Sequence, residues 1–167
     1  MSADARMSEV SIVAAASSHV DALAELQLDL IRYMAQIAPE GFGKSLTEPP
    51  AFEEIKATFV EAIDDPATRL LVAETGQRLA GFVMGVIEEH TDDLISAPFL
   101  TVQYVGVLKE YRRNGIAARL LAEMETWAKS RGITQIDLLV WEHNPDARAL
   151  FTKLGYMPLE HRLAKTI

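Results

Sequence analysis

The chain has 167 residues, 49% of them hydrophobic and 24% charged, a composition typical of one globular domain with a buried core. Its net charge of −8 argues against nucleic acid as the main partner, because binding phosphates requires a basic surface. It contains no cysteine, which excludes disulfides, thiolate metal sites and a cysteine nucleophile.

The apolar stretches are shorter than the roughly 18 residues that span a bilayer, so we expect no membrane partner. Residues 1–9 are polar and lack the apolar stretch of a secretion signal. We therefore expect a cytoplasmic protein, a monomer or homodimer, with a flexible N-terminus at residues 1–9 and one domain over residues 10–167.

The first half of the chain predicts helices and a hairpin. Ser18, followed three residues later by Asp21, resembles a capping box, and apolar residues at helical spacing follow it. Thr75-Gly76-Gln77 joins two β-type runs. The elements expected here are a strand at 10–14, a helix from 18 to about 36, a helix at 52–63 and strands at 70–74 and 79–88.

The second half alternates strands and helices. Arg131-Gly132 is a helix stop, and Asn144-Pro145 is a helix start. The elements expected here are a strand at 99–107, a helix from 115 to 131, a strand at 135–141, a short helix from 144 to 155, and final strands at 156–159 and 161–167. This order predicts an α+β domain with a mostly antiparallel mixed central sheet flanked by helices.

The turn after the strand at 99–107 carries the strongest functional signal. It reads Arg112-Arg113-Asn114-Gly115-Ile116-Ala117, and the helix opens on Gly115. A strand that runs through a glycine turn into a helix offers free backbone N–H groups and the positive end of the helix dipole, which suit a pyrophosphate. Turns of this kind also occur without a bound phosphate, so the rest of the chain has to decide.

A second motif follows about 30 residues later and reads Asn144-x-x-Ala147-x-x-Leu150-Phe151-x-Lys153-x-Gly155-Tyr156. It is similar to Asn-x-x-Ala-x-x-Leu-Tyr-x-Lys-x-Gly-Phe of the GNAT superfamily of acyl-coenzyme-A-dependent N-acetyltransferases, and Arg-x-x-Gly-x-Ala in the turn also resembles that family. The resemblance covers roughly residue 10 to the end. It implies a single-domain GNAT-like fold whose strands splay at the acyl-CoA site, with acetyl-CoA as co-substrate and no metal.

The resemblance assigns coenzyme contacts to three segments. The loop whose amides would hold the pyrophosphate comprises Arg112, Arg113, Asn114, Gly115, Ile116 and Ala117. The backbone of Val105, Gly106 and Val107 would bind the pantetheine arm like an added strand, and an N–H near Val105 would stabilise the oxyanion. Asn144, Ala147 and Phe151 complete the expected set. For Asn144 a plain helix cap is at least as good an interpretation, and the two roles can coexist. One of the two arginines is expected to be solvated surface charge.

The acid–base groups that relatives use are missing. Many relatives place a tyrosine acid where this chain has Phe151, and several place a glutamate base where it has Gln103. Neither replacement can transfer a proton in that role. A thiol of pKa near 8.5 leaves tolerably as thiolate, so loss of the acid is compatible with catalysis.

The remaining candidates for catalysis are weak and come from location alone: Glu88, Glu89, Tyr104 and His143. The acidic segment Glu88, Glu89, Asp92 and Asp93 could attract a cationic amine, or could be a solvated hairpin tip. Its spacing with His90 matches no metal-binding loop. Tyr33, Phe42 and Trp141 could line an acceptor pocket or belong to the core.

The leading hypothesis is transfer of an acetyl group from acetyl-CoA to a primary amine of a small molecule or peptide, by direct attack in a ternary complex. The acceptor is expected to be cationic. One alternative is an acyl-CoA-binding sensor or structural domain with weak or no catalysis, which the missing tyrosine and glutamate motivate. A surface interaction protein that keeps only the fold is a third, and the intact loop at 112–117 speaks against it.

Overall fold

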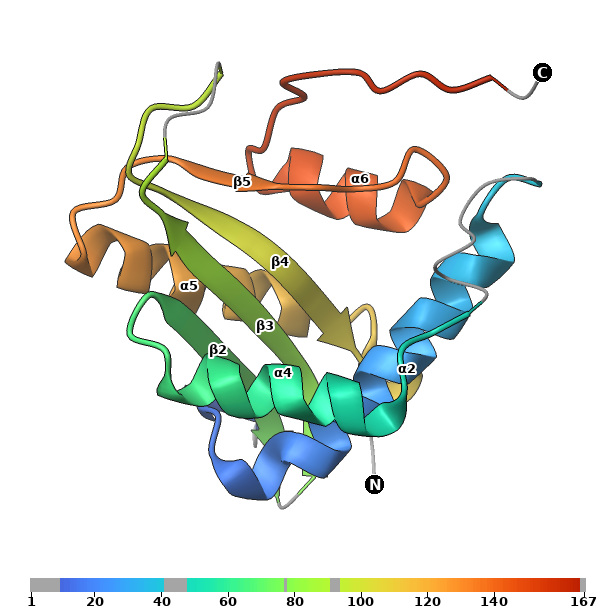
Figure 1. Ribbon diagram of the computed structural model, residues 1–167, viewed down its shortest axis with the longest axis vertical. Coiled ribbons are helices and arrows are strands. Elements are labelled where there is room, and N and C mark those ends of the chain that lie inside the picture. Colours follow the sequence, from blue (N-terminus) through green and yellow to red (C-terminus); the bar gives the residue numbers. More distant parts are fainter. Residues whose placement is uncertain (1–9, 41–47, 77, 91–93, 166–167) are drawn as a thin grey trace.

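A five-stranded sheet in the order β1-β2-β3-β4-β5 organises the protein, shown in Figure 1. The computed structural model describes residues 10–40, 48–76, 78–90 and 94–165. The strands are β1 Val10–Ala14, β2 Thr68–Thr75, β3 Arg78–Glu88, β4 Phe99–Val107 and β5 Ile136–Leu138. The first four strands are antiparallel neighbours, and β5 pairs parallel to β4. The expected mostly antiparallel mixed sheet is therefore confirmed.

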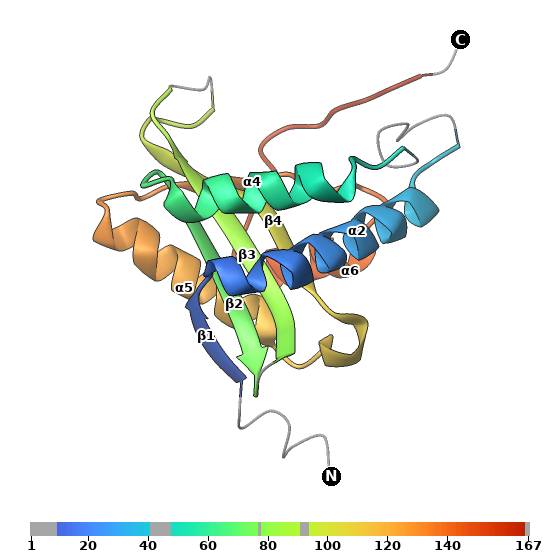
Figure 2. The same ribbon diagram turned by 60° about the horizontal axis from the view of Figure 1, so that its bottom comes forward.

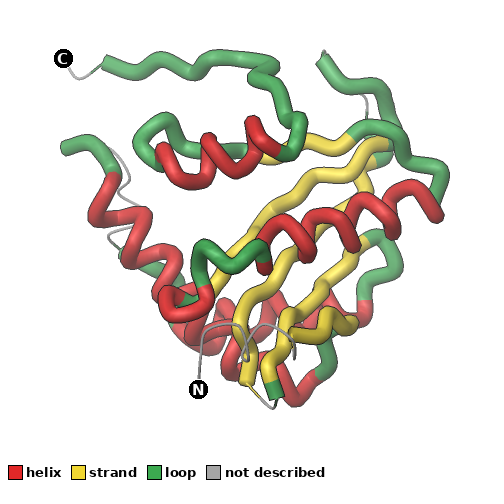
Figure 3. The backbone as a smooth tube through the Cα atoms, turned by 180° about the vertical axis from the view of Figure 1, so that it is seen from behind, coloured by secondary structure: helices red, strands yellow, loops and turns green. Residues whose placement is uncertain are grey.

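Helices cover both faces of this sheet (Figure 2). The helical elements are η1 Ser17–His19, α2 Val20–Ile37, α4 Phe52–Asp64, η2 Lys109–Tyr111, α5 Ile116–Ser130 and α6 Pro145–Lys153. On one face α2 and α4 bury an apolar cluster in which Phe59 meets Phe82 of β3 edge to face, with ring centroids 5.5 Å apart. On the other face α5 buries Ile116, Leu120 and Met124, and Figure 3 shows this helix crossing the sheet.

The pairing of β4 with β5 is short. Only the pairs Leu100↔Ile136, Thr101↔Asp137 and Val102↔Leu138 connect the two strands. Beyond Val102, β4 continues beside β3 to Val107, while the chain after β5 diverges from it. The splay of the strands expected from the resemblance is thus present at Val102.

A β-bulge sits at the point where this pairing stops. Met84 of β3 faces Tyr104, and the next pair is Gly85 with Val102, so Gln103 is the extra residue. The bulge shifts the side-chain alternation by one residue. Leu100, Val102 and Val105 therefore belong to the cluster on the α5 face, while Tyr104 lies on the face of α2 and α4.

Three predicted features differ from the structure. The described residues of 156–159 and 161–165 form no strand, because Pro158 cannot donate to a ladder and β5 offers only three paired residues; residues 166–167 lie outside the described part. Ser18 does not cap the first long helix. It lies within η1, and the His19 ring accepts the Ala16 N–H at 2.8 Å instead. The strand predicted at 135–141 is present only as β5.

Residues 1–9, where a flexible terminus was predicted, lie outside the described ranges. Within those ranges, no helix combines the length and the apolar character needed to cross a membrane.

Gly106 allows α2 to approach β4 closely. A Cβ built on Gly106 would overlap Leu30 Cδ1 and would lie 3.1 Å from Phe82 Cε1. We therefore expect Gly106→Ala to lower the free energy of unfolding by about 1–3 kcal/mol through overpacking. Urea denaturation measures this loss. Adding Leu30→Ala should recover part of it, because that change removes the overlapping methyl group; two losses that simply add would contradict the explanation.

Candidate functional site

The turn between β4 and α5 contains two residues with positive φ. Gly115 is the N-cap of α5 with φ of 76°, and Arg113 has φ of 65°. The first α-helical bond joins the Arg119 N–H to the Gly115 carbonyl at 3.0 Å, so the N–H groups of residues 115–118 precede the helical ladder. A Cβ on Gly115 would meet nothing within 4 Å. These amides lie at the positive end of the helix, beside the open space at Gly115, as an anion site requires.

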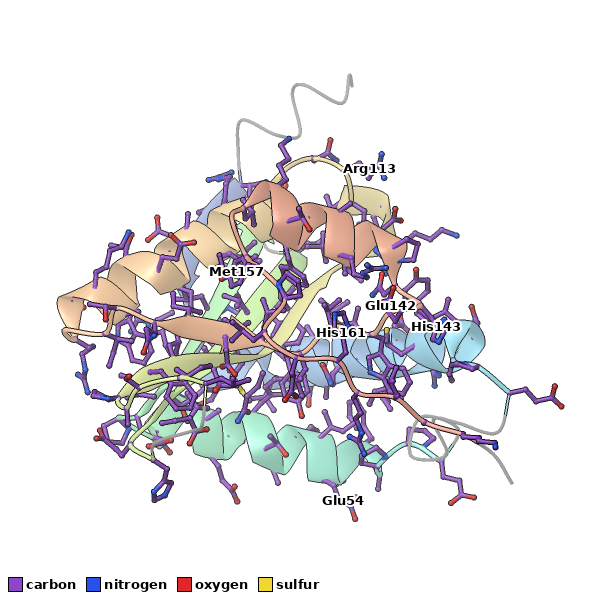
Figure 4. All side chains as sticks on the ribbon, turned by 90° about the horizontal axis from the view of Figure 1, so that it is seen from above. Glu54, Arg113, Glu142, His143, Met157 and His161 are labelled. Atoms are coloured by element: carbon purple, nitrogen blue, oxygen red, sulfur yellow. The ribbon has the colours of Figure 1, made fainter. Side chains whose placement is uncertain are left out.

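The two arginines of this turn have different surroundings. Arg112 Nε donates to the Val107 carbonyl at 3.0 Å, and its guanidinium lies over the Tyr33 ring, 5.3 Å from the centroid. Arg113 is highly exposed, projects outward in Figure 4, and lies 3.6 Å from the Asp146 carboxylate at the start of α6. Arg112 thus braces the end of β4 against α2, and Arg113 is the solvated one of the two.

The edge of β4 beside the turn is open to a ligand strand. The Leu100 N–H donates to the Gln135 carbonyl at 3.0 Å. The backbone groups of Leu100, and of every second residue after it up to the bulge, therefore point toward β5. After the bulge, the backbone groups of Val105 and Val107 point to this same side, beyond the last pair with β5. The Val107 carbonyl already accepts a hydrogen bond from Arg112. Val105 therefore directs its backbone groups toward the side from which β5 has diverged.

The N-terminus of α6 lies beside the turn between β4 and α5. Asn144 Oδ1 caps the helix by accepting the Ala147 N–H at 3.2 Å, and Asn144 Nδ2 lies 3.7 Å from the Met34 sulfur on α2. The capping alternative for Asn144 is therefore realised. Together with the Arg113–Asp146 pair, these contacts hold α6 beside the turn.

Phe151 is packed in the core. The residue is buried and meets the Tyr156 ring edge to face at 5.7 Å. Burial, and then the Glu125 carboxylate, raises the pKa of Tyr156 to about 12, so its hydroxyl is protonated at neutral pH. Phe151 therefore has a packing role beside Tyr156.

The four weak catalytic candidates are not brought together. Glu88 ends β3 opposite Phe99, at the far end of β4 from the Gly115 turn, and exposed Glu89 follows it. Tyr104 lies on the face of α2 and α4, whereas exposed His143 lies at the start of α6 (Figure 4). Asp92 and Asp93 of the acidic segment, and Phe42, lie outside the described residues. Of the aromatic candidates that are described, Tyr33 stacks under Arg112, and Trp141 is partly exposed.

Two cavities flank the sheet. A groove of about 770 Å³ runs along the outer side of β5, between α5, α6 and the segment after α6, and contains no residue of the turn. A smaller cavity of about 300 Å³ lies between α2, α4 and β4. Tyr104 lines it, and so does Gln27, a buried residue that sequence reasoning missed. A glutamine within the apolar stripe of the first long helix, between Leu23 and Ile31, was the available signal.

Metal ligation has no cluster to support it in the described ranges, where no three histidine or acidic side chains are grouped to hold an ion.

Solved structures with the same architecture include several acetyltransferases. The aminoglycoside N-acetyltransferase AAC(6')-Iy in complex with CoA matches with a TM-score of 0.74 and 16% identity, over 95% of this chain and 94% of that chain. AAC(6')-Ih of Acinetobacter baumannii, an aminoglycoside 6'-N-acetyltransferase, gives 0.72 and 20%, over 95% and 97%. A tetramutant of the BH1408 protein from Bacillus halodurans gives 0.79 and 13%, over 94% and 99%. At these identities the likeness shows the fold.

Sequence comparison identifies the family. Acetyltransferase ECA0875 of Pectobacterium atrosepticum is 33% identical over 86 residues, which are 52% of this chain and 55% of that protein, so the chain spans about half the length of this curated relative. The family model described as Acetyltransferase (GNAT) family matches residues 31–156, more than half of the chain. The resemblance drawn from the two motifs is therefore confirmed, and the chain belongs to the GNAT acetyltransferase family.

Proposed function

We propose that this protein transfers an acetyl group from acetyl-CoA to a primary amine. The observation that carries the proposal is the row of open amides at residues 115–118, placed directly beyond the unpaired edge of β4. Membership of the acetyltransferase family supports the same chemistry. The similar structures include one with CoA and one with a bisubstrate analogue of CoA and acetylneamine, which supports acetyl-CoA as co-substrate and a small-molecule amine as acceptor.

The turn and the strand edge divide the coenzyme between them. The amides of residues 115–118 would hold the pyrophosphate, with the α5 dipole favouring its charge. The outward-facing backbone of Val105 would pair with the pantetheine arm as an added strand does. Arg112 supports both parts, because it fixes the end of β4 at the Val107 carbonyl. Arg113, exposed beside the turn, adds positive charge.

Chemistry at the acyl group would rely on positioning more than on protein acids and bases. The neutral amine nitrogen would bond to the acyl carbon of acetyl-CoA, and the C–S bond of the resulting intermediate would then break. CoA would leave as the thiolate, and the proton lost by the nitrogen would pass to water. The Val105 N–H would stabilise negative charge on the carbonyl oxygen of this intermediate. Holding the amine next to the acyl carbon supplies much of the acceleration. Neither Gln103 nor Phe151 can exchange a proton, and this observation favours a second candidate function, an acyl-CoA-binding domain with weak catalysis.

Acetyl-CoA should stabilise the folded protein. Ligand at about 100 times its dissociation constant adds roughly 2.7 kcal/mol to the free energy of unfolding. Thermal denaturation with millimolar acetyl-CoA measures this as a raised Tm, and release of free CoA thiol with a panel of amines then separates the enzyme from the binding domain. An unchanged Tm would contradict the coenzyme site itself.

Gly115→Asn should weaken acetyl-CoA binding by about ten-fold or more, because its side chain would enter the open space in front of the amides. Gly132→Asn is a matched control, since Gly132 lies just past the other end of α5 with the same φ of 76° and the same open surroundings. Both variants carry similar strain of about 1 kcal/mol. Calorimetric titration with acetyl-CoA measures the difference, and equal affinities of the two variants would place the pyrophosphate elsewhere.

The pH dependence should follow the acceptor. With no protein base at the acyl carbon, kcat/KM should rise with pH as the acceptor ammonium loses its proton, and level off above the pKa of that amine. The midpoint should therefore move when one acceptor is replaced by another of different pKa. Steady-state rates over a pH series for two such amines test this, and a midpoint common to both would indicate a titrating group of the protein instead.

A further inference from the structure

The last two turns of α2 present one face to the candidate coenzyme site. Leu30, Tyr33 and Met34 are spaced i, i+3 and i+4, so their side chains leave the helix on the same side. Leu30 lies against Gly106, where its Cδ1 atom fills the space that a Cβ would need. Figure 1 shows the end of β4 reaching α2. One residue of this face therefore contacts the backbone segment 105–107.

Tyr33 contacts the turn between β4 and α5 through Arg112. The Arg112 guanidinium lies 5.3 Å from the centroid of the Tyr33 ring, within the range of a cation–π contact. In this position Arg112 Nε donates to the Val107 carbonyl at 3.0 Å. Holding a long side chain on one acceptor costs conformational entropy. The tyrosine ring offsets part of that cost, because it attracts the guanidinium in the position from which it reaches the carbonyl.

Met34 contacts the third segment, at the start of α6. Its sulfur lies 3.7 Å from Asn144 Nδ2, while Asn144 Oδ1 accepts the Ala147 N–H and caps α6. Figure 2 shows the second half of α2 beside α6, in agreement with this contact. Leu30 and Met34 thus hold the helix against β4 on one side and α6 on the other. The ring of Tyr33 between them has a fixed position from which to act on Arg112.

We propose that Tyr33 is a positioning residue for coenzyme binding, and that it acts through Arg112. While Arg112 holds the Val107 carbonyl, the end of β4 stays in place and the backbone of Val105 remains aligned for the pantetheine arm. The amides of residues 115–118 are set by the first turn of α5 instead. Tyr33 should therefore matter for the arm and not for the pyrophosphate. This inference rests on the proposed function for the identity of the ligand.

The test compares CoA with 3′-phosphoadenosine 5′-diphosphate, the nucleotide part of CoA without the pantetheine arm. Both carry the pyrophosphate, so the ratio of their dissociation constants isolates the contribution of the arm. The variants are Tyr33→Leu, which removes the ring, and Tyr33→Phe, which keeps it. Phe52→Leu is a matched control, because Lys56 Nζ lies 5.6 Å from the centroid of the Phe52 ring and the variant loses a cation–π contact on α4. Calorimetric titration gives both dissociation constants.

In Tyr33→Leu, CoA should bind about three- to ten-fold more weakly, as expected for the loss of a cation–π contact. The nucleotide should bind to this variant as it binds to the wild type. Tyr33→Phe and Phe52→Leu should both retain the wild-type ratio. In an Arg112→Met background, Tyr33→Leu should cause no further loss of CoA affinity, because the residue through which it acts is already gone.

Equal losses for CoA and the nucleotide in Tyr33→Leu would overturn the inference, because they would indicate a general loosening of the fold. A CoA affinity that Tyr33→Leu leaves unchanged would overturn it as well. Failure of the wild type to bind CoA would contradict the proposed function itself, and the inference with it. Binding with the expected ratios, but no thiol release from acetyl-CoA with a panel of amines, would contradict the proposed transfer and support the positioning role.

Discussion

The early end of the β4–β5 pairing is the constraint on which the candidate site depends. Parallel pairing requires two strands to stay side by side, and here it ends after Val102 and Leu138. Backbone groups of β4 beyond that point still have to be hydrogen-bonded or exposed to water. One of them, the Val107 carbonyl, is satisfied by Arg112. The edge at Val105 is left unpaired by β5, and the turn at Gly115 follows further along the chain.

The bulge at Gln103 decides which residues take part. Without the extra residue, the alternation of β4 would place Tyr104 on the α5 face and turn Val105 toward α2 and α4. With it, Val105 directs its backbone to the open edge, while Tyr104 lines the cavity beside Gln27. One inserted residue therefore turns the Val105 backbone toward the open edge and leaves the Tyr104 side chain on the face of α2 and α4. Gln103 is itself exposed, and its role as the extra residue of the bulge does not depend on a titratable side chain.

The sequence was most informative where local chemistry decides the structure. The left-handed turn at Gly115, the helix stop at Gly132 and the cap at Asn144 depend on neighbouring residues, and all three are present. The strands predicted after Gly155 failed because a strand needs a partner, and no sequence pattern revealed how short β5 would be. Gln27 was missed for a similar reason. Whether a polar side chain in an apolar stripe finds a partner depends on α4 and β4, which lie far away in the sequence.

Tyr104 and Val105 are neighbours in the sequence, but the bulge leaves their side chains on opposite faces of the sheet. A substitution at Tyr104 therefore changes the surface beside α2 and α4, whereas a substitution at Val105 changes the packing beneath α5. The backbone of Val105 faces the open edge in both cases, so the two faces of the sheet can vary in sequence without altering the groups at that edge.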